Sequence, residues 1–393
     1  MDVLLMLLSL ALGVPAAVAC AYLLGLTLLS APLPTPPRSS RRLRFDVIVP
    51  AHNEAAVIAR TLQSLARLDW PAEGFRRVVV ADNCSDATAA LARAAGATVF
   101  ERHDLSRRGK GYALAHAFAA SAAQGWADAV VVVDADSEVS PNLLEAFAAR
   151  IENGGAEALQ AHYGVLNPLA SWRTRLIEIA HGSFHVLRSR ARERLALSCG
   201  LRGNGWCVTH ALLRAVPFAA FSLTEDLEYG LVLGLAGRRV HYAHEARADA
   251  EMTSSAQVAL RQRQRWEQGR FALVRAFTPR LLGAWLRRRE RVAFDLLCDL
   301  LVPPLSYLCL HVLLFLAVAG GAPLAVPALW PGLAAALACV AVLVVYVLRG
   351  WALSDIGWRG ALDLARVPLF LLWKLRVLAT RGLREWVPTS RHP

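Results

Sequence analysis

The sequence lacks the paired cysteines and the glycine-rich loops that mark several common kinds of site. Its seven cysteines include no C-x-x-C pair, so they favour neither a zinc site nor a disulfide framework and are typical of thiols in a reducing compartment. No G-x-G-x-x-G or G-x-x-x-x-G-K-[ST] motif follows any predicted strand, which argues against a dinucleotide-binding or P-loop site. A nucleotide would have to be held in another way.

Hydrophobic residues, in contrast, are abundant. They make up 55% of the 393 residues, which is more than one soluble core needs. The longest apolar runs cover 3–29, 300–321 and 324–348, and each reaches the roughly 20 residues that a membrane-crossing helix needs. The sequence therefore predicts three transmembrane helices.

The first apolar run is interpreted as a retained anchor. It begins Met1-Asp2 without a basic stretch, and four arginines follow it between positions 38 and 44. A cleaved signal peptide is the alternative, since Ser30-Ala31 could serve as a cleavage site. Because positive residues favour the cytosolic side of a membrane, we expect a multi-pass protein of the inner (plasma) membrane whose main domain and C-terminus are cytosolic.

Positive charge is concentrated ahead of the second apolar run. The formal net charge is +12, and the segment 259–293 holds ten Arg against two Glu. Basic clusters bind nucleic-acid phosphates or anionic lipid headgroups. Since no nucleic-acid motif surrounds this cluster and a membrane run follows it, we expect a membrane surface and no nucleic acid as its partner. The segment 361–379 also has charges near one helical face, which favours an interfacial helix over a fourth crossing.

Between the first and second apolar runs the pattern predicts an α/β domain with a largely parallel sheet. We expect strands at 45–49, 78–81, 98–101 and 129–133, and helices at 54–68, 86–95 and 110–124. Further helices are predicted at 141–153, 171–194, 226–236 and 255–276. The predicted organisation is an anchor and linker at 1–37, a cytosolic domain at 38–277, and interfacial and transmembrane helices at 278–393.

Polar residues follow three of the predicted strands, where an open α/β sheet binds its ligand. Asn53 and Glu54 follow the first strand and could grip a base or ribose, while Asp82 after the second could accept a hydrogen bond from the N3–H of uracil. A turn or helix N-cap is the alternative for Asp82. Asp134 and Asp136 follow four valines, and such buried carboxylates favour a site for Mg²⁺ or Mn²⁺ that is completed by substrate phosphates.

Two later motifs complete a recognisable series. Thr224-Glu225-Asp226 opens a predicted helix, and Gln262-Arg263-Gln264-Arg265-Trp266 lies on another. Each alone could be a helix cap or a basic helix face. The ordered series of Asp82, D-x-D, T-E-D and Q-x-x-R-W, within residues 44–275, resembles the membrane-integrated family 2 glycosyltransferases, which include cellulose, hyaluronan and poly-N-acetylglucosamine synthases and ceramide glucosyltransferases.

The resemblance implies a GT-A (Rossmann-like) fold with transmembrane helices, and inverting transfer from a UDP-sugar with Mg²⁺ or Mn²⁺. It implies Asp226 as the general base and Asp136 as the metal ligand. The implied donor-binding residues are Asp82, Lys110, Asp134, Gln262, Arg265 and Trp266, and Asn53 and Glu54 join them because of their place after the first strand.

The acceptor is left open between a growing polysaccharide, with a partner for export, and a lipid that receives one sugar. A nucleotidyl or phosphoryl transferase and a non-catalytic membrane scaffold are the alternatives from other classes.

Overall fold

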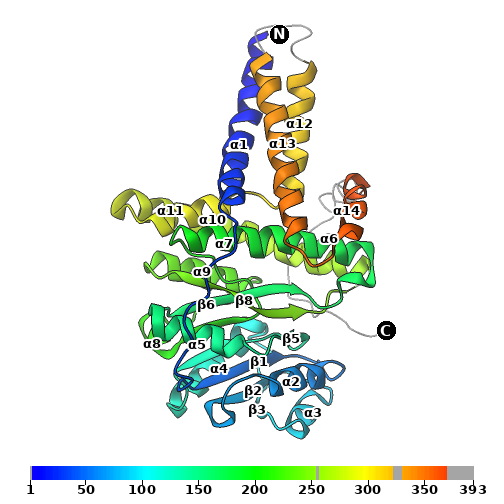
Figure 1. The fold of residues 1–393 in the computed structure, drawn as a ribbon. Helices are drawn as coiled ribbons and strands as arrows, with labels where there is room; N and C mark the ends of the chain where they lie inside the picture. Colours follow the sequence, from blue (N-terminus) through cyan, green and yellow to red (C-terminus); the bar gives the residue numbers. More distant parts are fainter. Residues whose placement is uncertain (1, 254–255, 322–329, 370–393) are drawn as a thin grey trace.

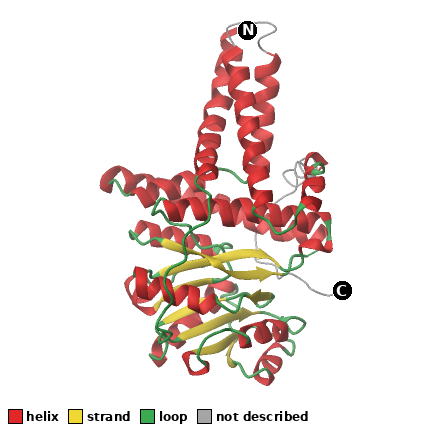
Figure 2. Cartoon of the chain, viewed as in Figure 1, coloured by secondary structure: helices red, strands yellow, loops and turns green. Residues whose placement is uncertain are grey.

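The computed structural model describes residues 2–253, 256–321 and 330–369 of the chain. An upright bundle of helices stands on a layer of helices that lie crosswise, and a mixed sheet with its own helices lies below that layer (Figures 1 and 2). The sheet has eight strands in the order β3-β2-β1-β4-β7-β6-β8-β5. They are β1 Phe45–Ala51, β2 Phe75–Asp82, β3 Thr98–Arg102, β4 Ala129–Val132, β5 Ser137–Val139, β6 Ala158–Val165, β7 Trp206–Thr209 and β8 Val240–Ala250.

The first half of the sheet confirms the predicted α/β pattern. Strands β1 to β4 include every predicted strand position except 133, and β1 pairs in parallel with both β2 and β4. Beyond β4 the sheet is mixed and not largely parallel as expected: β7 pairs antiparallel with β4 and with β6, while β6 pairs in parallel with β8. The later strands were not predicted from the sequence.

Helices cover both faces of this sheet. On one face they are α2 Ile58–Ala66, α3 Thr88–Ala94 and α5 Leu143–Gly154, and on the other they are α4 Lys110–Gln124, α8 His210–Ala215 and α9 Glu225–Leu235. Side chains alternate along a strand, so Val47 and Val49 of β1 join the first core while Ile48 joins the second. The parallel strands are therefore buried on both sides, as their continuous apolar sequence requires.

The crosswise layer consists of α6 Trp172–His181, a π-helical turn at Gly182–Leu187, α7 Arg188–Arg194, α10 Ala256–Arg288 and α11 Arg291–Leu301. Helix α10 continues past the predicted end at 276 and contains Pro279. Its residues Leu273, Phe277 and Leu281 pack against α11, and this packing outweighs the hydrogen bond that a proline removes. The boundary expected at 277–278 thus lies within α10.

The upright bundle contains α1 Asp2–Leu28, α12 Leu305–Gly321 and α13 Trp330–Ala352. By length and hydropathy two of the described helices, α1 and α13, can cross a membrane, and the count becomes three if the bent pair α11 and α12 forms one span. The predicted run 300–321 is divided, because Pro303 and Pro304 separate α11 from α12 with a bend of 69°. Residues 324–329 of the third predicted run lie outside the described residues.

The C-terminal prediction is tested only in part. Helix α14, Trp358–Leu364, covers the first residues of the expected interfacial helix at 361–379, and positions 370–379 lie outside the described part of the chain.

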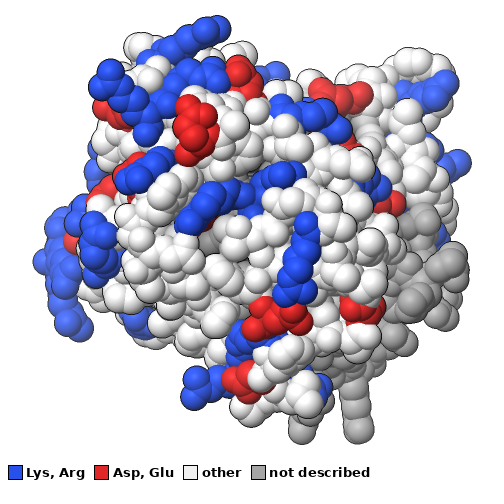
Figure 3. Space-filling view, turned by 90° about the horizontal axis from the view of Figure 1, so that it is seen from below, with Lys and Arg blue, Asp and Glu red and all other residues white. Residues whose placement is uncertain are grey.

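On the face opposite the upright bundle, basic side chains stand in separate groups with acidic ones between them (Figure 3).

Candidate active site

The carboxyl ends of β1, β2 and β4 bring the predicted polar residues to one edge of the sheet. Strand β1 lies between the other two strands and is parallel to both. Residues 52–54, Asp82 and the segment Asp134–Asp136 therefore leave neighbouring strands in the same direction. Parallel strands that end together place their following loops side by side, which is the arrangement that the sequence predicted.

Lys110, the first residue of α4, joins two of the sequence motifs to the loop before β7. Its Nζ lies 2.6 Å from Asp134 Oδ1 and 3.5 Å from Glu225 Oε1. The same ammonium donates a hydrogen bond of 2.6 Å to the carbonyl oxygen of Gly203. One cation thus connects the D-x-D segment, the T-E-D segment and the loop before β7.

The loop 203–205 is hydrogen-bonded to the D-x-D segment through Asn204. The fully buried Asn204 accepts a hydrogen bond from the backbone N–H of Asp134 at 3.0 Å and donates one to Ser137 Oγ at 2.9 Å. Gly203 has a φ of +90°, and a Cβ there would lie 3.3 Å from Asp226 Oδ2. The carboxylate of Asp226 therefore lies against this loop, beside the carbonyl that Lys110 binds.

The T-E-D segment packs against the helix that carries Q-x-x-R-W. A Cβ on Gly269 of α10 would lie 2.7 Å from the side chain of Thr224. Arg265 is one turn earlier on the same face of that helix, and its charge acts on the carboxyl group of Glu225. The structure therefore brings Arg265 to the predicted site, together with Asp134, Lys110 and Asp226.

Asp82 is held by an arginine that sequence reasoning did not single out. Arg102, opposite Asp82 on β3, places Nη1 2.6 Å from Asp82 Oδ1, and both side chains are about nine-tenths buried. The side-chain amide of Asn83 also donates to Oδ1, at 3.1 Å. Since both bonds go to the same oxygen, the direction of the carboxylate is fixed.

The other predicted donor-binding residues are less closely tied to this centre. Asn53 Oδ1 accepts a hydrogen bond of 2.8 Å from the backbone of Ser85, so it connects the loops after β1 and β2. The backbone N–H of Glu54 donates to Thr88 Oγ1 at the start of α3. Gln262 and Trp266 are half-buried on α10, four residues apart and hence on one helical face.

Burial and like charges make this a centre of raised carboxyl pKa values. Burial raises the pKa of Asp134, Glu225 and Asp226, and neighbouring carboxylates add to the effect. Burial alone would lower the pKa of Lys110, but Asp134 and Glu225 outweigh it and raise that pKa. Perturbed groups gathered in this way are typical of functional sites.

The residues present fit a hard divalent cation. The described residues contain no group of three or more His, Cys, Asp or Glu side chains placed to hold a metal by themselves. Mg²⁺ and Mn²⁺ sites on nucleotides commonly use one or two carboxylates, with phosphates and water completing the shell. Asp136 could supply such a carboxylate, and its charge acts on the carboxyl group of Asp134.

Tyr163 of β6 is a buried neighbour of the site that the sequence did not indicate. Its hydroxyl has a pKa raised well above the usual range by burial and by the charges of Asp134, Asp136 and Asp226. Its ring centroid lies 5.1 Å from those of His181 and His185, so Tyr163 packs against the crosswise layer next to the site. No spacing signal could have found it, because β6 itself was not predicted.

Comparison with known proteins agrees with this geometry. The family model described as "Glycosyltransferase like family 2" matches residues 42–269. The probable glycosyltransferase YdaM of Bacillus subtilis (strain 168) is 24% identical over 64% of this chain and 60% of its own length. The beta-monoglucosyldiacylglycerol synthase of Synechocystis sp. is 28% identical over 57% of this chain and 47% of its own length. The chain thus spans about half the length of these curated relatives.

A solved structure shares the fold. The mannosyltransferase PcManGT from Pyrobaculum calidifontis, in complex with GDP-Man and Mn²⁺, aligns with a TM-score of 0.53 and 19% identity over 86% of this chain and 98% of its own. At that identity the likeness concerns the fold, which is the predicted GT-A type. The family match covers more than half of the chain, and the chain belongs to the family 2 glycosyltransferases.

Proposed function

We propose that this protein is a metal-dependent, inverting glycosyltransferase that transfers a sugar from a UDP-sugar to a lipid-borne acceptor at the cytosolic face of the plasma membrane. The observation that carries the proposal is the position of Lys110, which contacts the D-x-D and T-E-D carboxylates and the Gly203 carbonyl at once. In a glycosyltransferase the donor diphosphate and the acceptor hydroxyl meet between the segments that bind the metal and carry the base, which are here the D-x-D and T-E-D segments.

Asp226 is the general base of this mechanism. It takes the proton of the acceptor hydroxyl while the oxygen attacks the anomeric carbon, and the bond from that carbon to the diphosphate breaks on the opposite face. One attack of this kind inverts the configuration. Burial raises the pKa of Asp226, which makes its carboxylate a stronger base than an exposed aspartate.

The donor is held from both ends. Asp82, fixed in direction by Arg102, accepts a hydrogen bond from the uracil of the donor, with Asn53 and Glu54 nearby. Lys110 and Arg265 face the diphosphate, where negative charge develops as the leaving group departs. Gln262 and Trp266 border the acceptor along α10. A divalent cation on Asp136 would add Lewis-acid stabilisation of that diphosphate when bound.

The packing of the upright bundle supports a lipid acceptor in preference to a growing polymer. Buried side chains fill the space between α1, α12 and α13, among them Leu23, Phe315 and Tyr346. A chain of sugars would need a passage through the membrane, and these described helices pack directly against one another. Synthesis of a polysaccharide would therefore require helices from a partner for export.

The test is sugar transfer by the purified protein in lipid. UDP- and GDP-sugars are screened with Mn²⁺, Mg²⁺ or EDTA against membrane lipids, and the product's anomeric configuration and length are determined. We expect transfer from one UDP-sugar, lost with EDTA, to give a lipid that carries a single inverted sugar. Transfer from a GDP-sugar would refute the role of Asp82, and a long polymer would refute the lipid acceptor.

Asp226→Asn provides the test of the base. Positioned acid–base catalysis contributes about 10²–10⁴-fold, so we expect a loss of that size in kcat while the donor still binds. Glu228→Gln is the matched control, because Glu228 lies in the same first turn of α9 and accepts a hydrogen bond from the Ser222 backbone at 2.9 Å. An equal loss in both variants would remove Asp226 as the base.

A further inference from the structure

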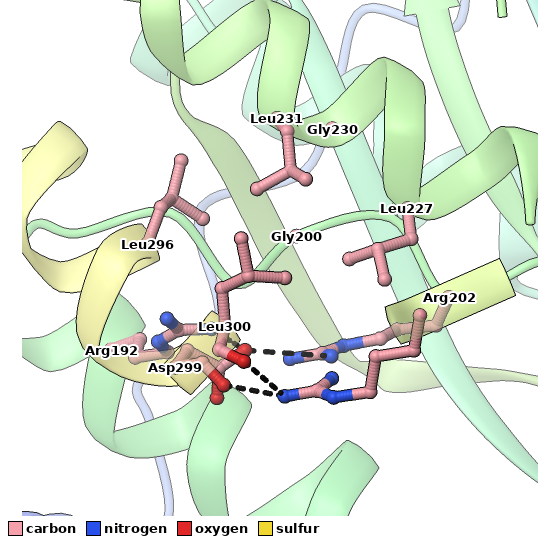
Figure 4. Close-up of a pocket in the computed structure, with 10 residues that line it drawn as sticks. Arg192, Gly200, Arg202, Leu227, Gly230, Leu231, Leu296, Asp299 and Leu300 are labelled. Atoms are coloured by element: carbon pink, nitrogen blue, oxygen red, sulfur yellow. Dashed lines mark hydrogen bonds and ion pairs between the residues drawn. The ribbon is translucent and has the colours of Figure 1, made fainter. Parts of the chain in front are cut away.

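A small cavity lies next to the T-E-D segment. Leu227, Gly230 and Leu231 of α9 form one wall. Leu296, Asp299 and Leu300 of α11 form the opposite wall, and Arg192, Gly200, Arg202 and Arg270 complete the lining (Figure 4). Leu227 follows Asp226 directly in the sequence, so this cavity adjoins the segment that carries the proposed base.

The charges around this cavity do not balance. Arg188, Arg192 and Arg202 lie 3.0, 3.1 and 4.0 Å from the carboxylate of Asp299. Arg192 also pairs with Asp295 at 2.9 Å. With Arg270, the arginines and aspartates that surround the cavity number four and two, which leaves a net charge of +2 in a buried place. Burying charge without compensation is costly.

Several arginine N–H groups around the cavity have no hydrogen-bond acceptor among the described residues. The Nε and Nη2 groups of Arg202 are buried and make no hydrogen bond to the described residues, and the Arg192 Nε group is in the same position. The Arg202 side chain is only 3% exposed. Arg270 Nη2, in contrast, donates to the carbonyls of Asp299, Leu300 and Val302 at the end of α11. The surplus donors therefore belong to Arg192 and to Arg202, whose guanidinium also lies 4.1 Å from the centroid of the Phe184 ring.

The size of the cavity limits what can fill it. Its volume is about 10 Å³, near the roughly 10–15 Å³ that one water-sized occupant needs. A phosphate or carboxylate group has several heavy atoms and exceeds that space, whereas a halide ion is a single sphere whose radius exceeds that of water by a few tenths of an ångström. A single negative charge there would meet the free Arg202 donors and halve the surplus positive charge.

We propose that this cavity is a binding site for one monovalent anion of the size of chloride. The anion would brace the loop that contains Arg202, and the next residues of that loop hold Lys110 through the Gly203 carbonyl and Asp134 through Asn204. The site is separate from the donor and acceptor, so the inference does not rest on the proposed function.

The experiment measures thermal unfolding of the full chain in lipid nanodiscs at constant ionic strength. Chloride or bromide replaces gluconate, an anion too large for the cavity, so that general screening stays the same. We expect a saturable rise in Tm of about 2 °C or more with either halide, since a ligand that binds only the folded state stabilises it. The same Tm in gluconate and chloride would overturn the proposal.

Two further measurements keep the result specific. Arg202→Gln should abolish the halide effect, while Arg238→Gln, which breaks the exposed pair with Glu157, should preserve it. A halide effect that survives in Arg202→Gln would place the anion elsewhere and refute the site. If Arg202→Gln does not fold, bromide-soaked crystals of the unchanged protein decide: an anomalous peak beside Arg202 supports the site, and a water alone in the cavity refutes it.

Discussion

Removal of the Lys110 charge gives the sharpest test of the site's electrostatics. Lys110→Met keeps the length of the side chain but leaves Asp134 and Glu225 without the ammonium that lies 2.6 and 3.5 Å from them. The loop at Gly203 also loses its hydrogen bond to Nζ. We therefore expect the variant to be both less stable and nearly inactive.

The expected loss of stability follows from burial. Breaking a fully buried ion pair costs about 3–5 kcal/mol, because a charge is left without a partner. The side chains of Lys110 and Asp134 are 24% and 27% exposed, and water reaching them reduces the cost to roughly 2 kcal/mol. In a domain of ordinary size this corresponds to a Tm lower by about 4–8 °C.

The assay compares thermal unfolding of the Lys110→Met, Arg67→Met and Lys110→Met/Asp134→Asn variants. Arg67 pairs with Glu138 at 3.6 Å on the surface, with 62% of the Arg67 side chain exposed, so its loss should cost about 0–1 kcal/mol. The double variant removes the orphaned carboxylate and should recover part of the stability. If Lys110→Met unfolds at the same temperature as Arg67→Met, the buried pair contributes nothing and the reasoning is wrong.

Lys110→Met should also change the dependence of stability on pH. Burial already raises the pKa values of Asp134 and Glu225 in the folded protein, and loss of the ammonium should raise them further. A carboxyl group with a raised folded-state pKa binds more protons when folded than when unfolded. Its contribution to stability therefore falls as the pH rises from the unfolded pKa, about 4, through the raised folded value. Urea unfolding should show a smaller deficit of the variant at the acid end of that window.

Three other predictions concern single residues. The catalytic base must be deprotonated, and burial raises the pKa of Asp226. In the pH profile of kcat, activity should therefore rise with pH along an acid limb that lies above the usual aspartate range. A limb near pH 4, the ordinary aspartate value, would contradict this. Arg102→Met should weaken UDP binding, measured by calorimetry, about tenfold or more, since Asp82 loses its ion pair. Unchanged binding would show that Asp82 does not contact the uracil. Gly203→Ala should reduce kcat far more than Gly237→Ala, because both glycines have positive φ but only at Gly203 would a Cβ crowd Asp226; equal losses would refute the contact.

Regular hydrophobic patterns made the first half of the domain predictable. Helix α4 has the predicted bounds of 110–124, since its apolar positions recur at helical spacing and Gly109 and Gly125 flank it. The strands β1, β2 and β4 carry continuous valine-rich runs, which is typical of buried parallel strands. The positions of Asp82, Asp134 and Asp136 followed directly from these strands.

The second half of the sheet gave no such pattern. Strand β8 carries His241, Glu245, Arg247 and Asp249 among small residues, and β6 contains Gln160 and His162. Some of these polar side chains bond to residues distant in sequence, as Gln160 does to the carbonyls of Asn204 and Gly205. Tertiary contacts outweigh local pattern here, so β6, β7 and β8, and with them the neighbouring Tyr163, could not be found from the sequence.

The same division explains why the motifs could be recognised while the contacts that position them could not. Asp134 and Asp226 stand in short sequence patterns, but Asn204 bonds to Asp134 and Gly203 lies against Asp226 in a loop that precedes an unpredicted strand. The D-x-D segment is positioned by the side chain of Asn204, which is fully buried and bonded on both sides. Asn204→Ala should therefore lower activity although it touches neither donor nor acceptor. Because the segment would shift while Asp226 kept its contact with Gly203, we expect weaker donor binding with an unchanged acid limb in the pH profile. A shifted limb with normal donor binding would instead show that Asn204 acts through the base.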